Sequence, residues 1–150
     1  MSELTSFSHA VGEANCHIQI TVAYRRKIFE REIVRVLTRD YILAQANRYG
    51  ITIAAINFGA DHCHFFAADC KNLSIAKIAN LLKGFSSCMM RRHHADLFKD
   101  LLWGKKFWSA GYFFRTVGAV NSATVQHYVS ESQQKHWKIS AGRQKKIIEF

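Results

Sequence analysis

The chain of 150 residues contains no proline, only four cysteines and no long apolar run. Without proline there is no proline-rich linker, and the sequence shows neither an internal repeat nor a low-complexity segment. No apolar run approaches the ~20 residues that a membrane-spanning helix needs. The polar N-terminal segment also lacks the pattern of a secretory signal. We therefore expect one globular protein in the cytoplasm, with no membrane association.

The cysteines do not form a metal-binding or disulfide framework. No two of them are spaced as Cys-x-x-Cys, and Cys63 stands in the middle of a predicted strand, which argues against a zinc ribbon. We expect reduced and mostly buried thiols. They are Cys16, Cys63, Cys70 and Cys88.

Acidic residues are also few. The 11 Asp and Glu residues face 21 Lys and Arg residues, which gives a net charge of +10 and a pI of about 9.7. This excess favours a polyanionic partner, with nucleic acid first and an anionic membrane surface second. Aromatic residues such as Tyr24, Trp103 and Phe107 lie near the basic clusters. Single-stranded nucleic acid needs this combination, because phosphates bind cations and unstacked bases bind flat apolar faces.

Six cations in or near these clusters are candidate DNA contacts, although a solvated charged surface explains each of them equally well. They are Arg25, Arg26, Arg91, Arg92, Lys105 and Arg115.

Hydrophobic periodicity predicts elements in the order β, α, β, β, α, β, α. Asn72 or Ser74 is the expected N-cap of the second helix, and Asn121 or Ser122 that of the third. Gly50 is expected to end the first helix. The expected ranges are a strand over 16–24, a helix over 29–49, a strand over 51–58, a strand from 62, a helix from 75 to 85 or 94, a strand over 107–117 and a helix from about 122.

This order predicts an α+β fold of ferredoxin-like topology, as in RNA-recognition modules. A four-stranded antiparallel sheet would carry two helices on one face, with an additional C-terminal helix. We expect a flexible N-terminal segment over 1–14, a single domain over 15–137 and a basic C-terminal tail over 138–150. The first and third strands are the central pair in this topology, which places the strand from His62 in mid-sheet.

Successive side chains on a strand point to opposite faces of the sheet. His62 and His64 therefore project from one face and Cys63 from the other. Two imidazoles about 6–7 Å apart along a strand can share one divalent cation if a third ligand completes the site. On spacing alone, two ordinary hydrogen-bonded histidines are the more frequent outcome. Three roles are open for Asp61: a metal ligand, a hydrogen-bond partner of a ligating histidine, or a turn residue after Gly59.

Several short motifs follow one another in order between residues 16 and 134. They are Tyr24-Arg25-Arg26-Lys27, Asp61-His62-Cys63-His64-Phe65, Leu82-Lys83-Gly84-Phe85-Ser86, Leu102-Trp103-Gly104, Phe107-Trp108-Ser109-Ala110-Gly111-Tyr112, Val117-Gly118-Ala119-Val120 and Tyr128-Val129. Singly each motif is unspecific. In this order they resemble the HUH-type single-tyrosine transposases of small insertion sequences, the IS200-like or TnpA type.

The resemblance implies a DNA transposase that cleaves and rejoins single-stranded DNA at insertion-sequence ends. In this family two histidines and a polar residue of the tyrosine helix hold Mg²⁺ or Mn²⁺. The tyrosine attacks the scissile phosphate, which leaves a 5′-phosphotyrosine and a free 3′-hydroxyl. Here His62 and His64 would be metal ligands and Tyr128 the nucleophile. Without the resemblance, Tyr128 would be interpreted as a core aromatic of an amphipathic helix.

The resemblance further implies a homodimer that exchanges the tyrosine helix between subunits. Such a dimer would recognise DNA hairpins at the element ends and associate with the nucleoid when bound to DNA.

The expected third metal ligand departs from the family pattern. The family often has Gln four residues after the tyrosine, where this chain has Ser132. On a regular helix Gln133 would be rotated roughly 140° from the tyrosine, whereas Glu131 and Ser132 lie within about 60°. We favour Gln133, which a π-bulge would return to the site. Glu131 or Ser132 as the ligand, and an altered site in an inactive or domesticated relative, stay open.

Two other functions fit the same residues. A non-catalytic single-stranded DNA- or RNA-binding module of this fold would ignore divalent metal and tolerate Tyr128→Phe. A metal-dependent phosphodiesterase would use His62 and His64 with water as the nucleophile and form no covalent adduct.

Overall fold

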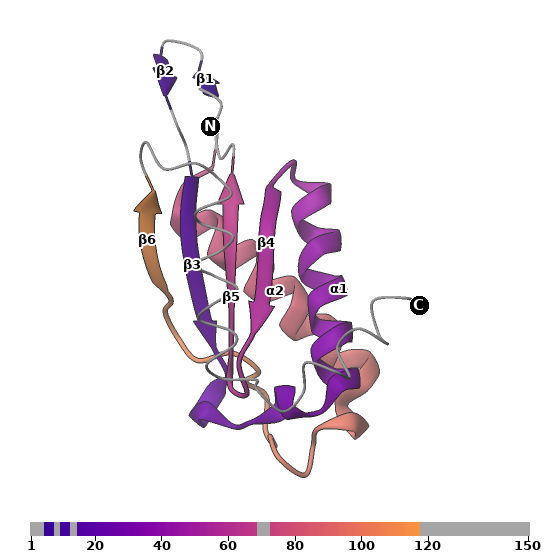
Figure 1. Ribbon diagram of the computed structural model, residues 1–150. Coiled ribbons are helices and arrows are strands. Elements are labelled where there is room, and N and C mark those ends of the chain that lie inside the picture. Colours follow the sequence, from indigo (N-terminus) through magenta and orange to yellow (C-terminus); the bar gives the residue numbers. More distant parts are fainter. Residues whose placement is uncertain (1–4, 8–9, 13–14, 69–72, 118–150) are drawn as a thin grey trace.

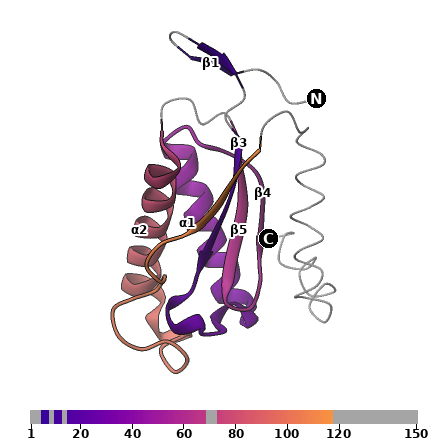
Figure 2. The same ribbon diagram turned by 90° about the vertical axis from the view of Figure 1, so that its left-hand side faces the viewer.

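The computed structural model describes residues 5–7, 10–12, 15–68 and 73–117. The strands β3 (Asn15–Thr21), β4 (Thr52–Phe58), β5 (His62–Ala68) and β6 (Phe113–Val117) form one antiparallel sheet with the spatial order β4-β5-β3-β6. The helices α1 (Glu32–Arg48) and α2 (Ile75–His94) lie side by side on one face of this sheet (Figures 1 and 2). The predicted four-stranded sheet with two helices on one face is confirmed, and β3 and β5 are its central pair.

Side-chain alternation on the central strands builds the core. Ile18 and Ile20 of β3 and Cys63 and Phe65 of β5 are fully buried in the main core cluster. The helices contribute fully buried side chains to the same cluster, among them Val34, Ile42, Ile78 and Leu82. The intervening positions of both strands, including His17 and His64, therefore point to the opposite face, which we call the site face. The predicted orientation of the histidine strand is confirmed.

The helix ends follow local sequence signals. Ser74 is the N-cap of α2, and its hydroxyl accepts a 3.1 Å hydrogen bond from the Lys77 amide. Gly50, just beyond α1, has a φ of 68°, a conformation that glycine adopts without strain.

The first helix begins later than predicted. The segment before it forms two 3₁₀ turns, η1 (Ala23–Arg25) and η2 (Ile28–Glu30), so that α1 starts at Glu32. Phe29 is buried, and its amide donates to the Ala60 carbonyl at 3.0 Å. This bond ties the segment to the turn between β4 and β5 instead of leaving it to extend the helix.

The last strand is shorter than predicted and begins at Phe113. Phe107 and Trp108 are buried in the core, and Trp108 Nε1 donates to the Ser86 hydroxyl of α2 at 2.9 Å. Gly111 has a φ of 80°, which interrupts the extended backbone. In the loop before β6, Trp108 forms an isolated antiparallel β-bridge with Val22.

Near the N-terminus, β1 (Thr5–Phe7) and β2 (Ala10–Gly12) pair as a two-stranded sheet that the sequence did not predict. The rest of the predicted flexible segment, the helix expected to carry Tyr128 and the tail 138–150 lie outside the described residues. Within the described ranges, no helix combines the length and apolar character needed to cross a bilayer.

Candidate metal and nucleic-acid site

Three histidines meet on the site face. His62 and His64 come from β5, and His17 comes from the neighbouring strand β3. The ring centres of His62 and His64 are 5.7 Å apart, and those of His17 and His64 are 5.5 Å apart. All three side chains are largely shielded from solvent, with exposed fractions of 9% for His62, 2% for His64 and 7% for His17. The strands thus hold three imidazoles in fixed mutual positions.

The Nδ1 atom of His62 is engaged by the residue before it. It lies 2.9 Å from Oδ1 of Asp61, whose Oδ2 accepts a 3.2 Å hydrogen bond from Nε of Arg25. Burial acts to raise the pKa of Asp61, but the hydrogen bonds from His62 and Arg25 outweigh it and hold the pKa below its ordinary value. An ionised carboxylate can accept a proton from Nδ1 of His62, and in that tautomer the lone pair of the ring is on Nε2.

The turn between β4 and β5 makes room for the His62 ring. A Cβ atom built on Gly59 would lie 2.1 Å from Cε1 of His62 and 2.6 Å from each ring nitrogen. The Gly59 amide also donates to the His62 carbonyl at 2.9 Å. Only glycine at this position is compatible with the observed ring placement.

The histidine pair fits a shared divalent cation. The two rings lie on one face of a strand with their centres 5.7 Å apart, and neutral imidazole is a common ligand of divalent metals. In the part of the chain that the structure describes, no group of three or more His, Cys, Asp or Glu side chains is arranged to hold a metal. His62 and His64 are thus two candidate ligands that would need a third from elsewhere in the chain. Tyr128 and the three candidate third ligands, Gln133, Ser132 and Glu131, lie outside the described residues.

A pocket opens directly beside His62. Its lining consists of Gln19, Arg25, Lys27, Ala60, Asp61 and His62. Tyr24 and Arg25 have φ values of 57° and 53°, a left-handed conformation that costs a non-glycine residue on the order of 1–2 kcal/mol. In this turn Arg25 reaches Asp61 while Lys27 stays exposed at the pocket. Two cations beside an imidazole pair form an environment suited to a phosphate group.

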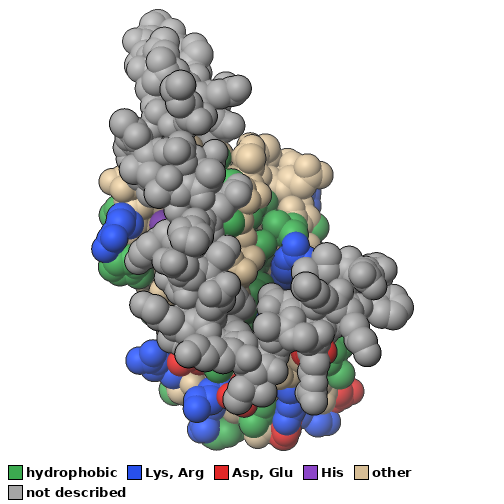
Figure 3. Space-filling view, in the orientation of Figure 1, with side chains coloured by type: hydrophobic (Ala, Val, Ile, Leu, Met, Phe, Trp, Pro, Cys, Tyr) green, Lys and Arg blue, Asp and Glu red, His purple; other side chains and the backbone are tan. Residues whose placement is uncertain are grey.

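The predicted DNA contacts other than Arg25 lie in different environments. Arg115 of β6 pairs in register with His17, and its charge adds to the effect of burial in lowering the pKa of His17. Arg26 stacks over Trp103, with its guanidinium carbon 4.6 Å from the ring centre, and the nearby Lys105 is exposed. Arg92 is exposed on α2, in the helix layer. In Figure 3, Lys and Arg side chains lie at the lower end of the molecule together with Asp and Glu side chains, and others lie higher on both edges.

Arg91 has a different environment from the other five. Its Nη1 donates to the Leu102 carbonyl at 3.0 Å, its Nη2 donates to the Lys106 carbonyl, and its guanidinium lies over the Phe98 ring. Burial lowers the pKa of Arg91. Arg91 thus connects α2 to the loop that carries Trp103.

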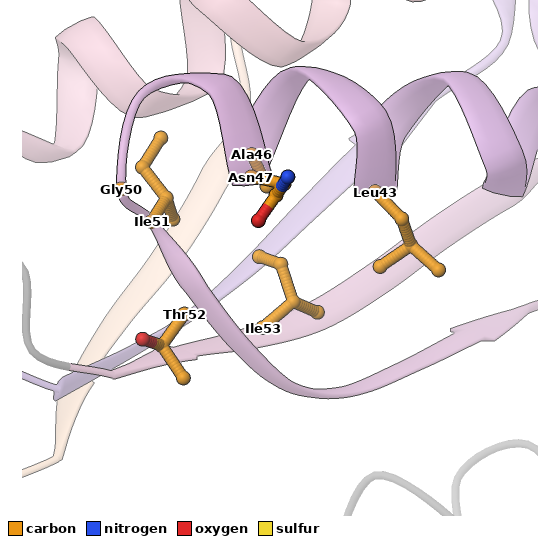
Figure 4. A pocket seen from close by; sticks show the side chains of 7 residues that line it. All are labelled: Leu43, Ala46, Asn47, Gly50, Ile51, Thr52 and Ile53. Carbon is orange, nitrogen blue, oxygen red and sulfur yellow. The ribbon is translucent and has the colours of Figure 1, made fainter.

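A second pocket lies between the end of α1 and the start of β4 (Figure 4). Its lining contains no titratable side chain; it consists of Leu43, Ala46, Asn47, Gly50, Ile51, Thr52 and Ile53. This pocket offers no group for acid–base or metal chemistry.

Sequence reasoning missed three residues of the site. His17 was not singled out, Lys27 was named only as part of a motif, and the contact of Gly59 with the His62 ring was not foreseen. His17 could have been found from its place on the polar face of the first predicted strand, since that strand was already expected beside the histidine strand. The role of Gly59 depends on a ring position that no sequence pattern specifies.

Comparison with known proteins identifies the family of the chain. The profile of the family described as "Transposase IS200 like" matches residues 10–132, most of the chain. The chain belongs to the IS200-like transposase family. Members of this family are HUH tyrosine transposases, which are in general metal-dependent nucleases. No curated protein matches the chain.

Two solved structures share the fold. The crystal structure of a candidate transposase from Deinococcus radiodurans R1 has a TM-score of 0.65 and 22% identity, and the match covers 86% of this chain and 98% of that one. A REP-associated tyrosine transposase bound to a REP hairpin has a TM-score of 0.51 and 15% identity, with 86% of this chain and 68% of that one covered. These similarities support the ferredoxin-like arrangement of this IS200-like protein.

Proposed function

We propose that this protein cleaves and rejoins single-stranded DNA at insertion-sequence ends through a 5′-phosphotyrosine formed on Tyr128. The observation that carries the proposal is the pair His62 and His64 on the site face, with their ring centres 5.7 Å apart. Beside this pair lies the pocket that contains Arg25 and Lys27. Membership of the IS200-like family supports the same reaction.

His62 and His64 would hold Mg²⁺ or Mn²⁺ through their Nε2 atoms, with Gln133 as the proposed third ligand and Ser132 or Glu131 as alternatives. The bound cation would neutralise the scissile phosphate and orient its oxygens. This help is needed because a phenol, with an ordinary pKa near 10, is a poor nucleophile at neutral pH. Asp61 fixes the tautomer of His62, and Arg25 holds Asp61 in place at 3.2 Å. These contacts would keep Nε2 of His62 in the tautomer that can bind a cation.

The reaction balances without an external energy source. The Tyr128 oxygen forms a bond to phosphorus and loses its proton, the bond from phosphorus to the 3′-oxygen breaks, and that oxygen leaves as a hydroxyl. A phosphodiester is exchanged for a phosphodiester, so the 3′-hydroxyl of another DNA end can reverse the attack and join the strands. Arg25 and Lys27 would bind the phosphate beside His62, since both line that pocket.

Base and hairpin contacts would involve the exposed aromatic and basic side chains at the lower end of the sheet. Trp103 is 63% exposed and lies under the guanidinium of Arg26, and Lys105 is exposed in the same loop. Stacking of one unpaired base on such a ring is worth about 1–3 kcal/mol. Hairpin recognition is proposed by analogy with the REP-associated transposase, whose structure contains a REP hairpin. A homodimer that exchanges the tyrosine helix remains part of the proposal.

The test is cleavage of labelled single-stranded DNA that carries candidate element ends, with Mg²⁺, Mn²⁺ or EDTA. Cleavage should require the cation and be lost in His64→Ala. The matched control is His93→Ala, which removes an exposed imidazole at the end of α2 and should cleave normally. Binding of the correct DNA without cleavage by the wild type would favour the non-catalytic module. Cleavage that releases both products without a covalent adduct would favour the water-dependent phosphodiesterase.

A further inference from the structure

His17 makes a specific contact with one of the two proposed metal ligands. Its Nε2 lies 3.3 Å from Nδ1 of His64, and the two rings meet edge to face with an interplanar angle of 77°. Both side chains are buried, and they come from the adjacent central strands β3 and β5. The pairing of these strands places His64 opposite Gln19, which is two residues from His17 and on the same face of β3. The backbone of the sheet therefore fixes this contact.

The proton in this contact decides which nitrogen of His64 can bind a cation. If His17 donated to Nδ1, the proton of neutral His64 would lie on Nε2 and block that atom. If His64 donates from Nδ1, its Nε2 carries the lone pair. His62 has its Nδ1 similarly engaged, by Asp61. A metal-binding histidine usually donates the N–H of its second ring nitrogen to an acceptor such as a carboxylate or a backbone carbonyl. This hydrogen bond fixes both the tautomer and the ring orientation.

We propose that His17 is a positioning residue that accepts the Nδ1 proton of His64 and thereby keeps Nε2 of His64 available for the cation. The inference rests on the proposed metal-dependent function. Asp61 and His17 would then act in the same way on the two ligands, one as a carboxylate acceptor and one as a neutral imidazole acceptor.

The direct test is the tautomer of His64 in the metal-free protein, read from the ¹⁵N shifts of its ring nitrogens. The wild type should carry the proton on Nδ1. His17→Phe keeps a ring of similar size but removes the acceptor, so His64 should shift towards the Nε2-protonated form that predominates in water. Mn²⁺ affinity, measured by calorimetry, should fall about 10–100-fold. His17→Gln supplies a carbonyl oxygen as acceptor and should restore most of both properties.

The two proposals fail in different ways. A wild-type His64 protonated on Nε2, or a folded His17→Phe variant with unchanged tautomer and Mn²⁺ affinity, would overturn the role of His17. Loss of Mn²⁺ binding that His17→Gln does not restore would also contradict it. Absence of Mn²⁺ binding by the wild type would instead overturn the metal-dependent function. If His17→Phe does not fold, the tautomer of the wild type still decides the question.

Discussion

At the residue scale, the absence of a side chain at Gly59 leaves the space that the His62 ring occupies. Gly59→Ala would place a methyl carbon 2.1 Å from the His62 ring, so the imidazole must move away. We expect Mn²⁺ affinity to fall by at least about tenfold, because the ring would lose its contact with Asp61. Calorimetric titration with Mn²⁺ measures this, and thermal unfolding checks that the variant is folded.

Gly84→Ala is the matched control for this prediction. Gly84 lies within α2, and a Cβ there would meet no atom within 4 Å. Replacing a helical glycine with alanine should raise stability by about 0.5–1 kcal/mol and leave Mn²⁺ binding unchanged. Wild-type affinity in Gly59→Ala would show that the His62 ring position is not needed for the metal.

Sequence analysis predicted the orientation of His62 and His64 because strand alternation is a local property. The hydrogen-bond partners of these histidines were harder to predict. His17 meets His64 only through the register of two strands whose contact spans 47 residues of sequence. Three interpretations of Asp61 were open, and the structure shows that its carboxylate contacts Nδ1 of His62 at 2.9 Å.

At the scale of elements, Arg91 and Arg92 are adjacent in sequence but have different environments. Arg91 donates to the carbonyls of Leu102 and Lys106, so Arg91→Ala should destabilise the fold by about 1–3 kcal/mol. Arg92 is exposed, and Arg92→Ala should change the free energy of unfolding by less than about 0.5 kcal/mol. Urea unfolding of both variants tests the distinction. Equal stability of the two variants would exclude a structural role for Arg91.

The start of α1 depends on a charge pair that should respond to acid. Arg31 donates to both carboxylate oxygens of Asp100 at 2.6 Å, and these hydrogen bonds lower the pKa of Asp100 from 3.8 to about 2. A lowered pKa contributes stability that is complete above the ordinary value and lost as the pH falls towards 2. Asp100→Asn should therefore flatten the fall in the urea midpoint between about pH 4 and 2. Asp40→Asn, at an exposed site on α1, is the control, and the urea midpoint of this variant should fall with pH as steeply as that of the wild type.

Element positions were predictable where local signals exist and less so where tertiary contacts decide. Ser74 and Gly50 marked helix ends correctly. The last strand was predicted too long because Phe107 and Trp108 have high strand propensity. In the structure they lie in the loop before β6, and their side chains are buried in the hydrophobic core. The pair β1 and β2 was missed because strands of three residues give too little alternation to detect.

At the scale of the whole molecule, the net charge of +10 predicts DNA binding that depends strongly on salt. Each lost phosphate contact should reduce the slope of log affinity against log salt by about 0.7 on single-stranded DNA. We expect this reduction for Lys27→Ala, since Lys27 lines the pocket beside His62. Lys77→Ala removes the same charge from the exposed start of α2 and should leave the slope unchanged. Equal slopes for both variants and the wild type would place the DNA elsewhere.

The topology was predictable because the order of strands and helices leaves few ways to build an antiparallel sheet with one helical layer. The composition indicated a nucleic-acid partner without specifying the reaction. The ordered motifs supplied the family, which the match over residues 10–132 confirms. The identity of the nucleophile depends on a segment that lies outside the described residues, and it therefore needs chemical evidence.

The measurement that tests the central claim most directly is mass spectrometry of the protein after incubation with single-stranded DNA and Mn²⁺. After nuclease and protease digestion, the account predicts one peptide with a 5′-linked nucleotide on Tyr128, absent when EDTA replaces the metal. The same modification should be missing in His64→Ala. A nucleotide attached to a different residue, or cleavage of the DNA with Tyr128 unmodified throughout, would contradict the tyrosine mechanism.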